Sequence, residues 1–113
     1  MANKKPRFEI VTLSALAEPT RKQLVELLRD GPLTVGEIAD RLGIRQPQAS
    51  KHLKVLSDCG ILEMRAEANR RIYMLRGEEF QKMNEWAQSF TRAMSERFDK
   101  LDGYLNRIQK NKT

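Results

Sequence analysis

A short segment, residues 45–54, gathers side chains that can form hydrogen bonds with the edges of nucleic-acid bases. At about 100° per residue, its polar and apolar positions fall on opposite sides of a helix. Carboxamides pair well with adenine, and an ammonium group pairs with O6 and N7 of guanine. We therefore expect Gln46 and Gln48 to contact adenine and Lys51 to contact guanine. Ser50 can contact either kind of base.

Four basic residues are better suited to the phosphate backbone. Arg45 and Lys54 belong to the same segment, and Arg70 and Arg71 lie in a predicted hairpin, where the second strand begins. We expect the second pair to enter a flanking minor groove or to bind its phosphates. The alternative for this pair is a solvated loop tip. Phosphate contacts would supply much of the affinity for DNA and would make that affinity depend on salt.

The residues that could support catalysis or hold a metal ion are few. The chain has one histidine, His52, and one cysteine, Cys59, which excludes an internal disulfide and any site that needs two of either. His52 falls on the apolar side of its predicted helix, so we expect it in the core. Cys59 follows an acidic residue at a turn and is expected to behave as a small hydrophobic side chain, with oxidation or alkylation sensing as the alternative. We expect no enzymatic activity, no metal and no cofactor.

The positive charge is concentrated in one part of the chain. The 113 residues carry 21 Lys and Arg against 15 Asp and Glu, and the isoelectric point is about 9.8. Residues 41–76 hold eight of these basic residues and three of the acidic ones, and so account for +5 of the net charge of +6. A local basic surface of this kind favours an anionic partner.

Length and hydropathy bound the class of protein. No segment approaches the roughly 20 apolar residues of a membrane span. No apolar run follows the basic first residues, so we expect neither membrane insertion nor a signal peptide. The length fits one domain, and a lone cysteine fits a reducing compartment. We therefore expect a cytoplasmic, nucleoid-associated protein.

Short helices must position the polar segment. Thr34 and Glu37 have the spacing of a capping box, which predicts that one helix begins there, and Gly43 predicts its end. Two short helices joined by a glycine turn, the second with a polar side, are typical of a helix-turn-helix. Apolar spacing and breakers place the helices at residues 10–16, 19–30, 34–42 and 46–57.

A hairpin follows these helices. Strands are predicted at Ile61–Arg65 and Arg71–Leu75, around residues 66–70, in the position of the wing of a winged helix. We therefore expect a mainly α fold with a small β-hairpin, a winged helix-turn-helix. The predicted organisation is a basic arm (1–7), a DNA-binding domain (8–77) and a long helix with a short tail (78–113).

The last predicted helix, roughly Glu78–Ile108, carries an apolar stripe. Its apolar residues recur in steps of three and four, a heptad pattern with one stutter. A domain of this size cannot cover such a stripe, so we expect the same helix of a second subunit to cover it. The alternative is a helix that packs on its own domain. The expected interface residues on this helix are Phe80, Met83, Ala87, Phe90, Met94, Phe98 and Leu101.

Taken together, several segments resemble the ArsR family of bacterial winged-helix repressors. The similarity runs from about Leu13 to Leu75, and its most specific part is Pro47-Gln48-Ala49-Ser50-Lys51-His52-Leu53 followed by Gly60-Ile61-Leu62. The resemblance implies a dimeric transcriptional repressor that an effector releases from DNA. It also implies that the first and last helices form the dimer interface, which adds Leu13. The other similar segments are Leu16–Arg21, Leu27-Leu28, Glu37–Gly43 and Arg71–Leu75.

The chain departs from the family pattern in three ways. Metal sensors of the family carry Cys-x-Cys on the third helix or His and acidic ligands on the terminal helix, whereas this sequence has no cysteine in the first and no histidine in the second. We therefore predict a non-metal-sensing, autorepressor-like member. Arg45 stands where the family usually caps the recognition helix with Ser, which predicts a weaker cap. The wing tip lacks the usual Gly, and we expect Asn69 to adopt a positive φ there.

These observations favour a sequence-specific transcriptional regulator, a homodimeric repressor that binds an inverted-repeat operator in double-stranded DNA. The alternative is a winged-helix module that docks an acidic protein partner and does not bind plain duplex DNA even at low salt. The inducing signal stays open between a protein antagonist, a small organic effector between the terminal helices, and oxidation of Cys59. Activation in place of repression also stays open, because it depends on where the operator lies.

Overall fold

The computed structural model describes residues 9–111 of the chain. The predicted basic arm, residues 1–7, lies outside the described residues. The described residues form two compact units that divide within the last helix, between Lys82 and Met83. The first unit contains the short helices and the sheet, and the second is the remainder of that helix. Within the described part of the chain, no helix is long and apolar enough to cross a membrane.

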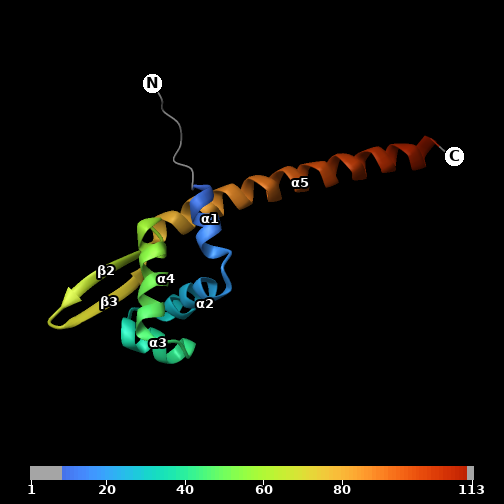
Figure 1. The fold of residues 1–113 in the computed structure, drawn as a ribbon. Helices are drawn as coiled ribbons and strands as arrows, with labels where there is room; N and C mark the ends of the chain where they lie inside the picture. The colour runs from blue at the N-terminus through green and yellow to red at the C-terminus, as the bar shows by residue number, and fades with distance from the viewer. Residues whose placement is uncertain (1–8, 112–113) are drawn as a thin grey trace, which may run out of the picture. The chain divides into compact units, whose positions relative to one another are not determined.

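The first unit is a helix-turn-helix followed by a hairpin, as predicted (Figure 1). One core of buried apolar side chains joins its helices to its sheet, and Leu24, Ile38, Leu53 and Ile61 are completely buried in it. The elements are α1 (Ile10–Leu16), α2 (Pro19–Leu27), the 3-10 turn η1 (Leu28–Asp30), β1 (Leu33–Thr34), α3 (Val35–Leu42), α4 (Gln46–Asp58), β2 (Leu62–Glu67), β3 (Arg70–Leu75) and α5 (Gly77–Asn111).

The capping signals of α3 are confirmed. Thr34 Oγ1 accepts from the Glu37 backbone N–H at 3.2 Å, and Glu37 Oε1 accepts from the Thr34 N–H at 2.9 Å. The helix ends at Gly43, whose φ of 68° and ψ of 33° place it in the left-handed region that glycine adopts without strain. Both ends of the first helix of the helix-turn-helix are therefore fixed by local sequence.

The first helix is confirmed, and its two buried residues are among its smaller side chains. α1 buries Thr12 and Ala15, whereas Ile10 is 78% exposed. α1 contacts both α2 and α4. The small side chains of Thr12 and Ala15 allow these helices to approach closely, and this leaves the larger Ile10 on the outer side.

The hairpin is longer and tighter than predicted. Residues 66–70 were expected to form a loop, but the strands continue through Glu67 and resume at Arg70, which leaves a two-residue turn. The expectation of a positive φ at Asn69 is wrong: among the described non-glycine residues only Ala68 has one, at 54°. A positive φ at the first turn residue alone is the pattern of a type II′ turn, in which glycine is the usual residue.

A third strand, β1, is an addition to the prediction. The sheet has the order β1-β3-β2, and all its neighbours are antiparallel. In this sheet Leu33 lies opposite Tyr73 and Thr34 lies opposite Ile72. The residue that caps α3 is therefore also paired with the central strand of the sheet.

Candidate nucleic-acid interface

The polar segment singled out in the sequence forms a two-sided helix. The apolar side of α4 is completely buried, because Ala49, Leu53 and Leu56 each have 0% exposure. Figure 1 shows α4 beside the hairpin, and contacts join it to α1, α2, α3 and β2. The predicted DNA-contacting residues of this segment are all exposed; they are Arg45, Gln46, Gln48, Ser50, Lys51 and Lys54. The helical spacing places Ser50, Lys51 and Lys54 on the side away from the core, whereas Gln46, seven residues before Leu53, lies in line with the buried side at the start of the helix.

The start of α4 is capped from within the helix. Arg45 is the N-cap residue and makes no side-chain cap hydrogen bond there, since a guanidinium has no acceptor. Gln48 Oε1 accepts from the Arg45 backbone N–H at 3.2 Å. The predicted weak cap is thus partly compensated, and a proposed base-reading side chain also stabilises the helix that carries it.

The basic side chains of α4 are available to an anion. Lys51 is exposed, and Lys54 Nζ lies 3.5 Å from Asp58 Oδ2 with both side chains more than half exposed. An ion pair this exposed contributes about 0–1 kcal/mol. A phosphate could therefore replace Asp58 as the partner of Lys54 at little cost.

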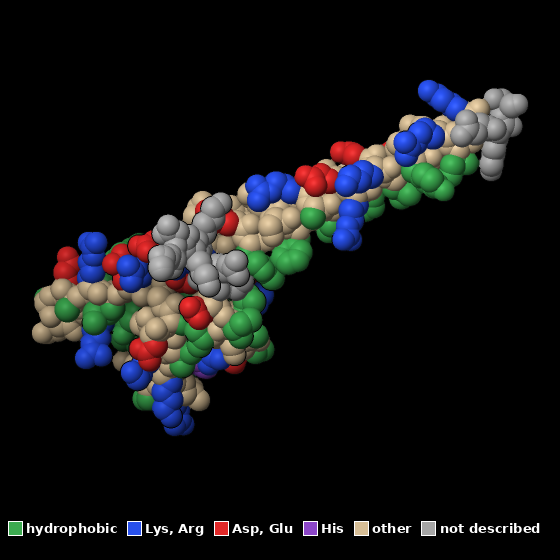
Figure 2. All heavy atoms as spheres, turned by 90° about the horizontal axis from the view of Figure 1, so that it is seen from above, with side chains coloured by type: hydrophobic (Ala, Val, Ile, Leu, Met, Phe, Trp, Pro, Cys, Tyr) green, Lys and Arg blue, Asp and Glu red, His purple; other side chains and the backbone are tan. Residues whose placement is uncertain are grey.

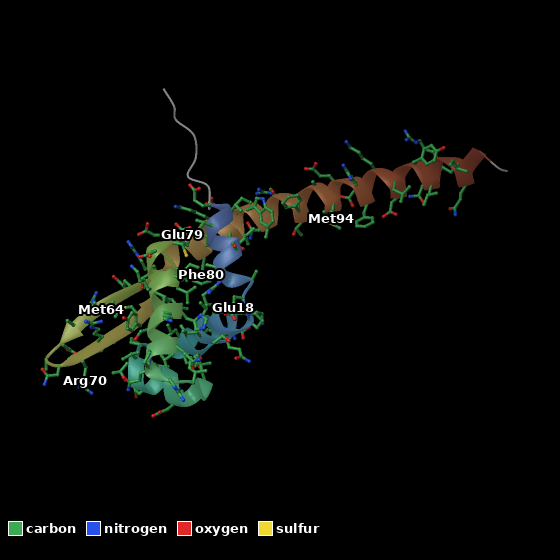
Figure 3. All side chains as sticks on the ribbon, in the orientation of Figure 1. Glu18, Met64, Arg70, Glu79, Phe80 and Met94 are labelled. Carbon is green, nitrogen blue, oxygen red and sulfur yellow. The ribbon has the colours of Figure 1, made fainter. Side chains whose placement is uncertain are left out.

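The register of the hairpin separates the two arginines of the wing. Arg70 lies opposite Glu67 and Arg71 lies opposite Ala66, so their side chains point to opposite faces of the sheet. Arg71 shares its face with Met64 and Tyr73, and Tyr73 packs against the core. Arg70 lies near the hairpin tip (Figure 3). The roles of the two arginines could not be separated from the sequence, because they depend on the strand register.

The first turn of α3 holds a glutamate with a lowered pKa, and one of the causes is an arginine of the wing. The backbone N–H of Thr34 lowers the pKa of Glu37, with smaller contributions from the Thr34 hydroxyl, Arg41 and Arg70. The contribution from Arg70 is the smallest of these. The direct link between the wing and the helix-turn-helix is the pairing of Thr34 with Ile72 of β3.

The capping role of Glu18 was not predicted from the sequence. Glu18 caps α2 by accepting from the Arg21 backbone N–H at 2.8 Å, and this bond is the main cause of its lowered pKa. Its Oε2 also lies 3.8 Å from Nδ1 of His52, whose side chain is 24% exposed. His52 is thus partly buried and faces a carboxylate. The position of Glu18 directly before Pro19 was the available signal, since proline favours the first turn of a helix.

The surroundings of Cys59 disfavour a reactive thiolate. Burial raises the pKa of its thiol, and the nearby carboxylates of Glu79 and Asp58 act in the same direction. The Sγ donates to the Leu56 carbonyl oxygen at 3.5 Å. Across residues 9–111 there is no group of three or more His, Cys, Asp or Glu side chains placed to hold a metal ion.

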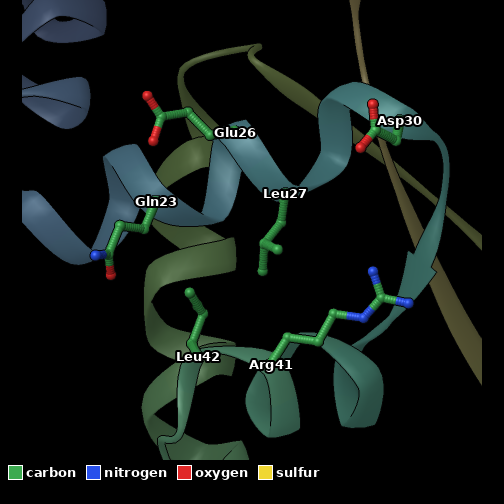
Figure 4. Close-up of a pocket in the computed structure, with 6 residues that line it drawn as sticks. All are labelled: Gln23, Glu26, Leu27, Asp30, Arg41 and Leu42. Carbon is green, nitrogen blue, oxygen red and sulfur yellow. The ribbon is translucent and has the colours of Figure 1, made fainter.

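An open groove lies between α2 and α3 (Figure 4). Leu27 and Leu42 point toward one another across it. Its rim carries Glu26 and Asp30 on one side and Arg41 on the other. None of the predicted DNA-contacting residues lines this groove, so it is a separate feature of the first unit.

The second unit presents an apolar stripe along one side of a helix. Figure 2 shows hydrophobic side chains along one side of α5 and charged side chains along another. Trp86 and Phe90, four residues apart, contact edge to face with ring centroids 5.0 Å apart. Among the residues predicted at a dimer interface, Phe80 packs against the core of the first unit, and Leu13 and Met83 are half-buried. Exposure of the larger residues of the stripe is between 46% and 59%: Trp86, Phe90, Met94, Phe98, Leu101, Tyr104 and Leu105.

Comparison with known proteins identifies the relatives of the chain. A helix-turn-helix domain family matches residues 16–65. The chain is 42% identical over 65 residues to the biofilm growth-associated repressor of Agrobacterium fabrum, covering 58% of this chain and 56% of that protein. It is 37% identical over 76 residues to the transcriptional activator HlyU of Vibrio cholerae, covering 67% of this chain and 70% of that protein. The chain thus spans little more than half the length of several curated relatives that it matches.

Solved structures show the same fold. An ArsR family transcriptional regulator, RHA00566, superimposes with a TM-score of 0.67 at 27% identity, covering 75% of this chain and 88% of that chain. The homodimeric winged helix-turn-helix DNA-binding domain of Mb0332 from Mycobacterium bovis gives a TM-score of 0.63 at 28% identity, covering 81% and 91%. The order of elements, the two-sided α4 and these similarities all point to the same family. The chain belongs to the ArsR family of winged helix-turn-helix transcriptional regulators.

Proposed function

We propose that this chain is a homodimeric, sequence-specific DNA-binding repressor. The observation that carries the proposal is the two-sided α4, in which Ala49, Leu53 and Leu56 are completely buried while its glutamines, Ser50 and its lysines are exposed. An exposed helix face of this composition offers both donors and acceptors to a major groove. The proposal places the protein at chromosomal DNA in the cytoplasm.

The roles of the side chains follow from their positions. Gln46, Gln48 and Lys51 would read base edges, with Ser50 as an adaptable contact. Arg45 and Lys54 would bind phosphates at the two ends of the reading surface. Arg70 and Arg71 would contact the flanking backbone or minor groove from the wing. These two arginines lie on opposite faces of the hairpin, and Arg71 shares its face with Tyr73, which packs against the core. We therefore propose that Arg70 makes the larger contribution to DNA binding.

Dimerisation would proceed through the terminal helices. The Mycobacterium bovis domain is described as homodimeric, and the stripe on α5 offers about half of each large apolar side chain for burial. A two-fold dimer would place its two α4 helices in successive major grooves about 34 Å apart, and so would select an inverted repeat. The interface would comprise Leu13, Phe80, Met83, Ala87, Phe90, Met94, Phe98 and Leu101.

Regulation would act on this dimer. The relatives include a repressor and an activator by name. We propose repression, through an operator that overlaps a promoter, and release from DNA by a protein antagonist or a small organic effector.

The proposal is tested by selecting binding sites from a random duplex pool and measuring the selected sites again at several salt concentrations. We expect an inverted repeat whose half-sites lie about one helical turn apart. Variants Gln48→Ala and Lys51→Ala should lose base preference within each half-site. If no sequence is enriched and the amount of DNA retained falls uniformly as salt rises, the basic surface binds DNA only through nonspecific electrostatic attraction. Absence of duplex binding at low salt would favour docking of an acidic protein.

The dimer is tested with a charge placed in the stripe. Phe98→Glu should shift the protein from dimer to monomer in sedimentation equilibrium, because it would place a carboxylate in an apolar interface. Gln88→Glu adds the same charge on the same helix outside the stripe and should leave the dimer intact. Equal dissociation by the two variants would indicate a general charge effect and not an interface.

A further inference from the structure

The backbone conformation at Gly36 does not require glycine. It is the second residue of α3, and its φ is not among the positive glycine φ values of the described residues, which belong to Gly31, Gly43 and Gly60. Within a helix, glycine is less favourable than alanine because it loses more backbone freedom on folding. Because no backbone conformation requires glycine here, the relevant feature is the space that a side chain at this position would occupy.

That space is occupied by a side chain from α4. A Cβ on Gly36 would lie 3.3 Å from Nε2 of Gln46 and 4.0 Å from Oγ1 of Thr34. The first of these distances is shorter than an ordinary van der Waals contact. By contrast, apart from its chain neighbours and the nearby backbone of its own helix, no described atom lies within 4 Å of a Cβ built on Gly103, a glycine within α5. The carboxamide of Gln46 therefore occupies part of the space that a side chain at position 36 would need.

We propose that Gly36 is a positioning residue for base recognition, because a side chain at this position would displace the Gln46 carboxamide from the place it occupies. This inference rests on the proposed function, in which Gln46 reads a base. A bidentate pair with adenine needs Oε1 and Nε2 in line with N6 and N7 at once. Hydrogen bonds weaken as their angles depart from linearity, so a displacement of the amide weakens both.

The contact identifies what yields when a methyl group is added. Nε2 is the far end of a flexible, exposed side chain, whereas the opposing atoms of α3 belong to a capped helix turn. In Gly36→Ala we therefore expect the Gln46 amide to move and the fold to remain unchanged. The inference therefore separates two quantities that usually change together: Gly36→Ala alters which base is preferred and leaves folding intact.

The test compares Gly36→Ala, Gln46→Ala and the double variant in the full chain. Thermal melting of Gly36→Ala should stay unchanged or rise by up to about 4 °C, as for the matched helix control Gly103→Ala. Site selection and competition binding should show that Gly36→Ala lowers the preference at one base pair of each half-site by about tenfold. Gln46→Ala should lower it at the same base pair, and the double variant should lose no more than Gln46→Ala alone.

Other outcomes overturn the inference in recognisable ways. An unchanged base preference in Gly36→Ala, with the wild type still enriching its operator, refutes the inference and leaves the proposed function standing. Uniform weakening on every sequence, equal in the presence and absence of the Gln46 side chain, would mean that α3 itself approaches the DNA backbone. Loss of folding in Gly36→Ala but not in the double variant would make the contact structural. A wild type that enriches no sequence overturns both proposals.

Discussion

Gln48 has two roles in the proposed complex, and a pair of substitutions separates them. Its Oε1 accepts from the Arg45 backbone N–H at 3.2 Å, and its carboxamide is exposed on the reading side of α4. Gln48→Ala removes both the acceptor and the base contact. Gln48→Glu keeps an acceptor at the same distance along the side chain but removes the donor and adds a negative charge.

The expected effects on stability follow from one exposed hydrogen bond. Loss of such a cap in Gln48→Ala should cost about 0.5–1 kcal/mol, which corresponds to a fall in Tm of roughly 2–5 °C. Glutamate is the residue that completes a capping box, and its charge suits the first turn of a helix. Gln48→Glu should therefore melt at or slightly above the temperature of the wild type.

The two variants should differ in stability but should both lose base discrimination in DNA binding. Both variants lose the adenine contact, so each should lose about 1–3 kcal/mol of discrimination at one base pair, or about 5- to 150-fold. Gln48→Glu should also bind all duplexes more weakly because of its added charge. The ratio of operator affinity to scrambled-duplex affinity removes this general term and isolates the base contact.

Thermal melts and competition binding on the same preparations decide between the roles. If Gln48→Glu melts as low as Gln48→Ala, the capping role is wrong. If Gln48→Glu keeps the wild-type ratio of operator to scrambled-duplex affinity, Gln48 does not read a base. The two results are independent, so one role can fail while the other stands.

Three further predictions concern the wing, the thiol and the acidic caps. Arg70→Ala should weaken binding to operator and scrambled duplex alike and reduce the salt slope of log K by about one; a loss confined to one base pair would contradict a phosphate contact. Iodoacetamide should alkylate Cys59 more slowly in the folded chain than in urea, because burial raises the pKa of its thiol, and equal rates would contradict this. Hydrogen bonds to backbone N–H groups lower the pKa of Glu18 and Glu37, so the stability they contribute is present above the ordinary glutamate pKa of about 4.3 and is lost as pH falls through the lowered values. Tm should therefore fall on acidification below about pH 5, and less steeply in Glu37→Gln; identical pH profiles would refute the role of Glu37.

The parts of the fold that could be predicted are those with local causes. The capping box at Thr34 and Glu37 and the left-handed Gly43 each involve residues a few positions apart, and both are confirmed. The buried side of α4 follows from the helical spacing of Ala49, Leu53 and Leu56. In each case the signal and the contact lie within one or two turns of the chain.

The parts that could not be predicted depend on contacts between distant segments. β1 is only two residues long, too short for an alternating pattern, and exists because it pairs with β3 far along the chain. The choice of Ala68 over Asn69 for the positive φ depends on where the strands end. The close approach of Gln46 to Gly36 is between two helices, so no residue spacing within the sequence predicts it.

The double use of Thr34 has a consequence for how the protein opens. This residue pairs with Ile72 in the sheet and caps α3 in the helix-turn-helix. Fraying of β1 would therefore also release the first turn of α3, so the two events should form one cooperative opening unit. In native-state hydrogen exchange, the amides of Glu37 and Thr34 should share one opening free energy. A wing held on DNA would protect both, and occupancy of the operator could then be followed at amides that touch no nucleotide.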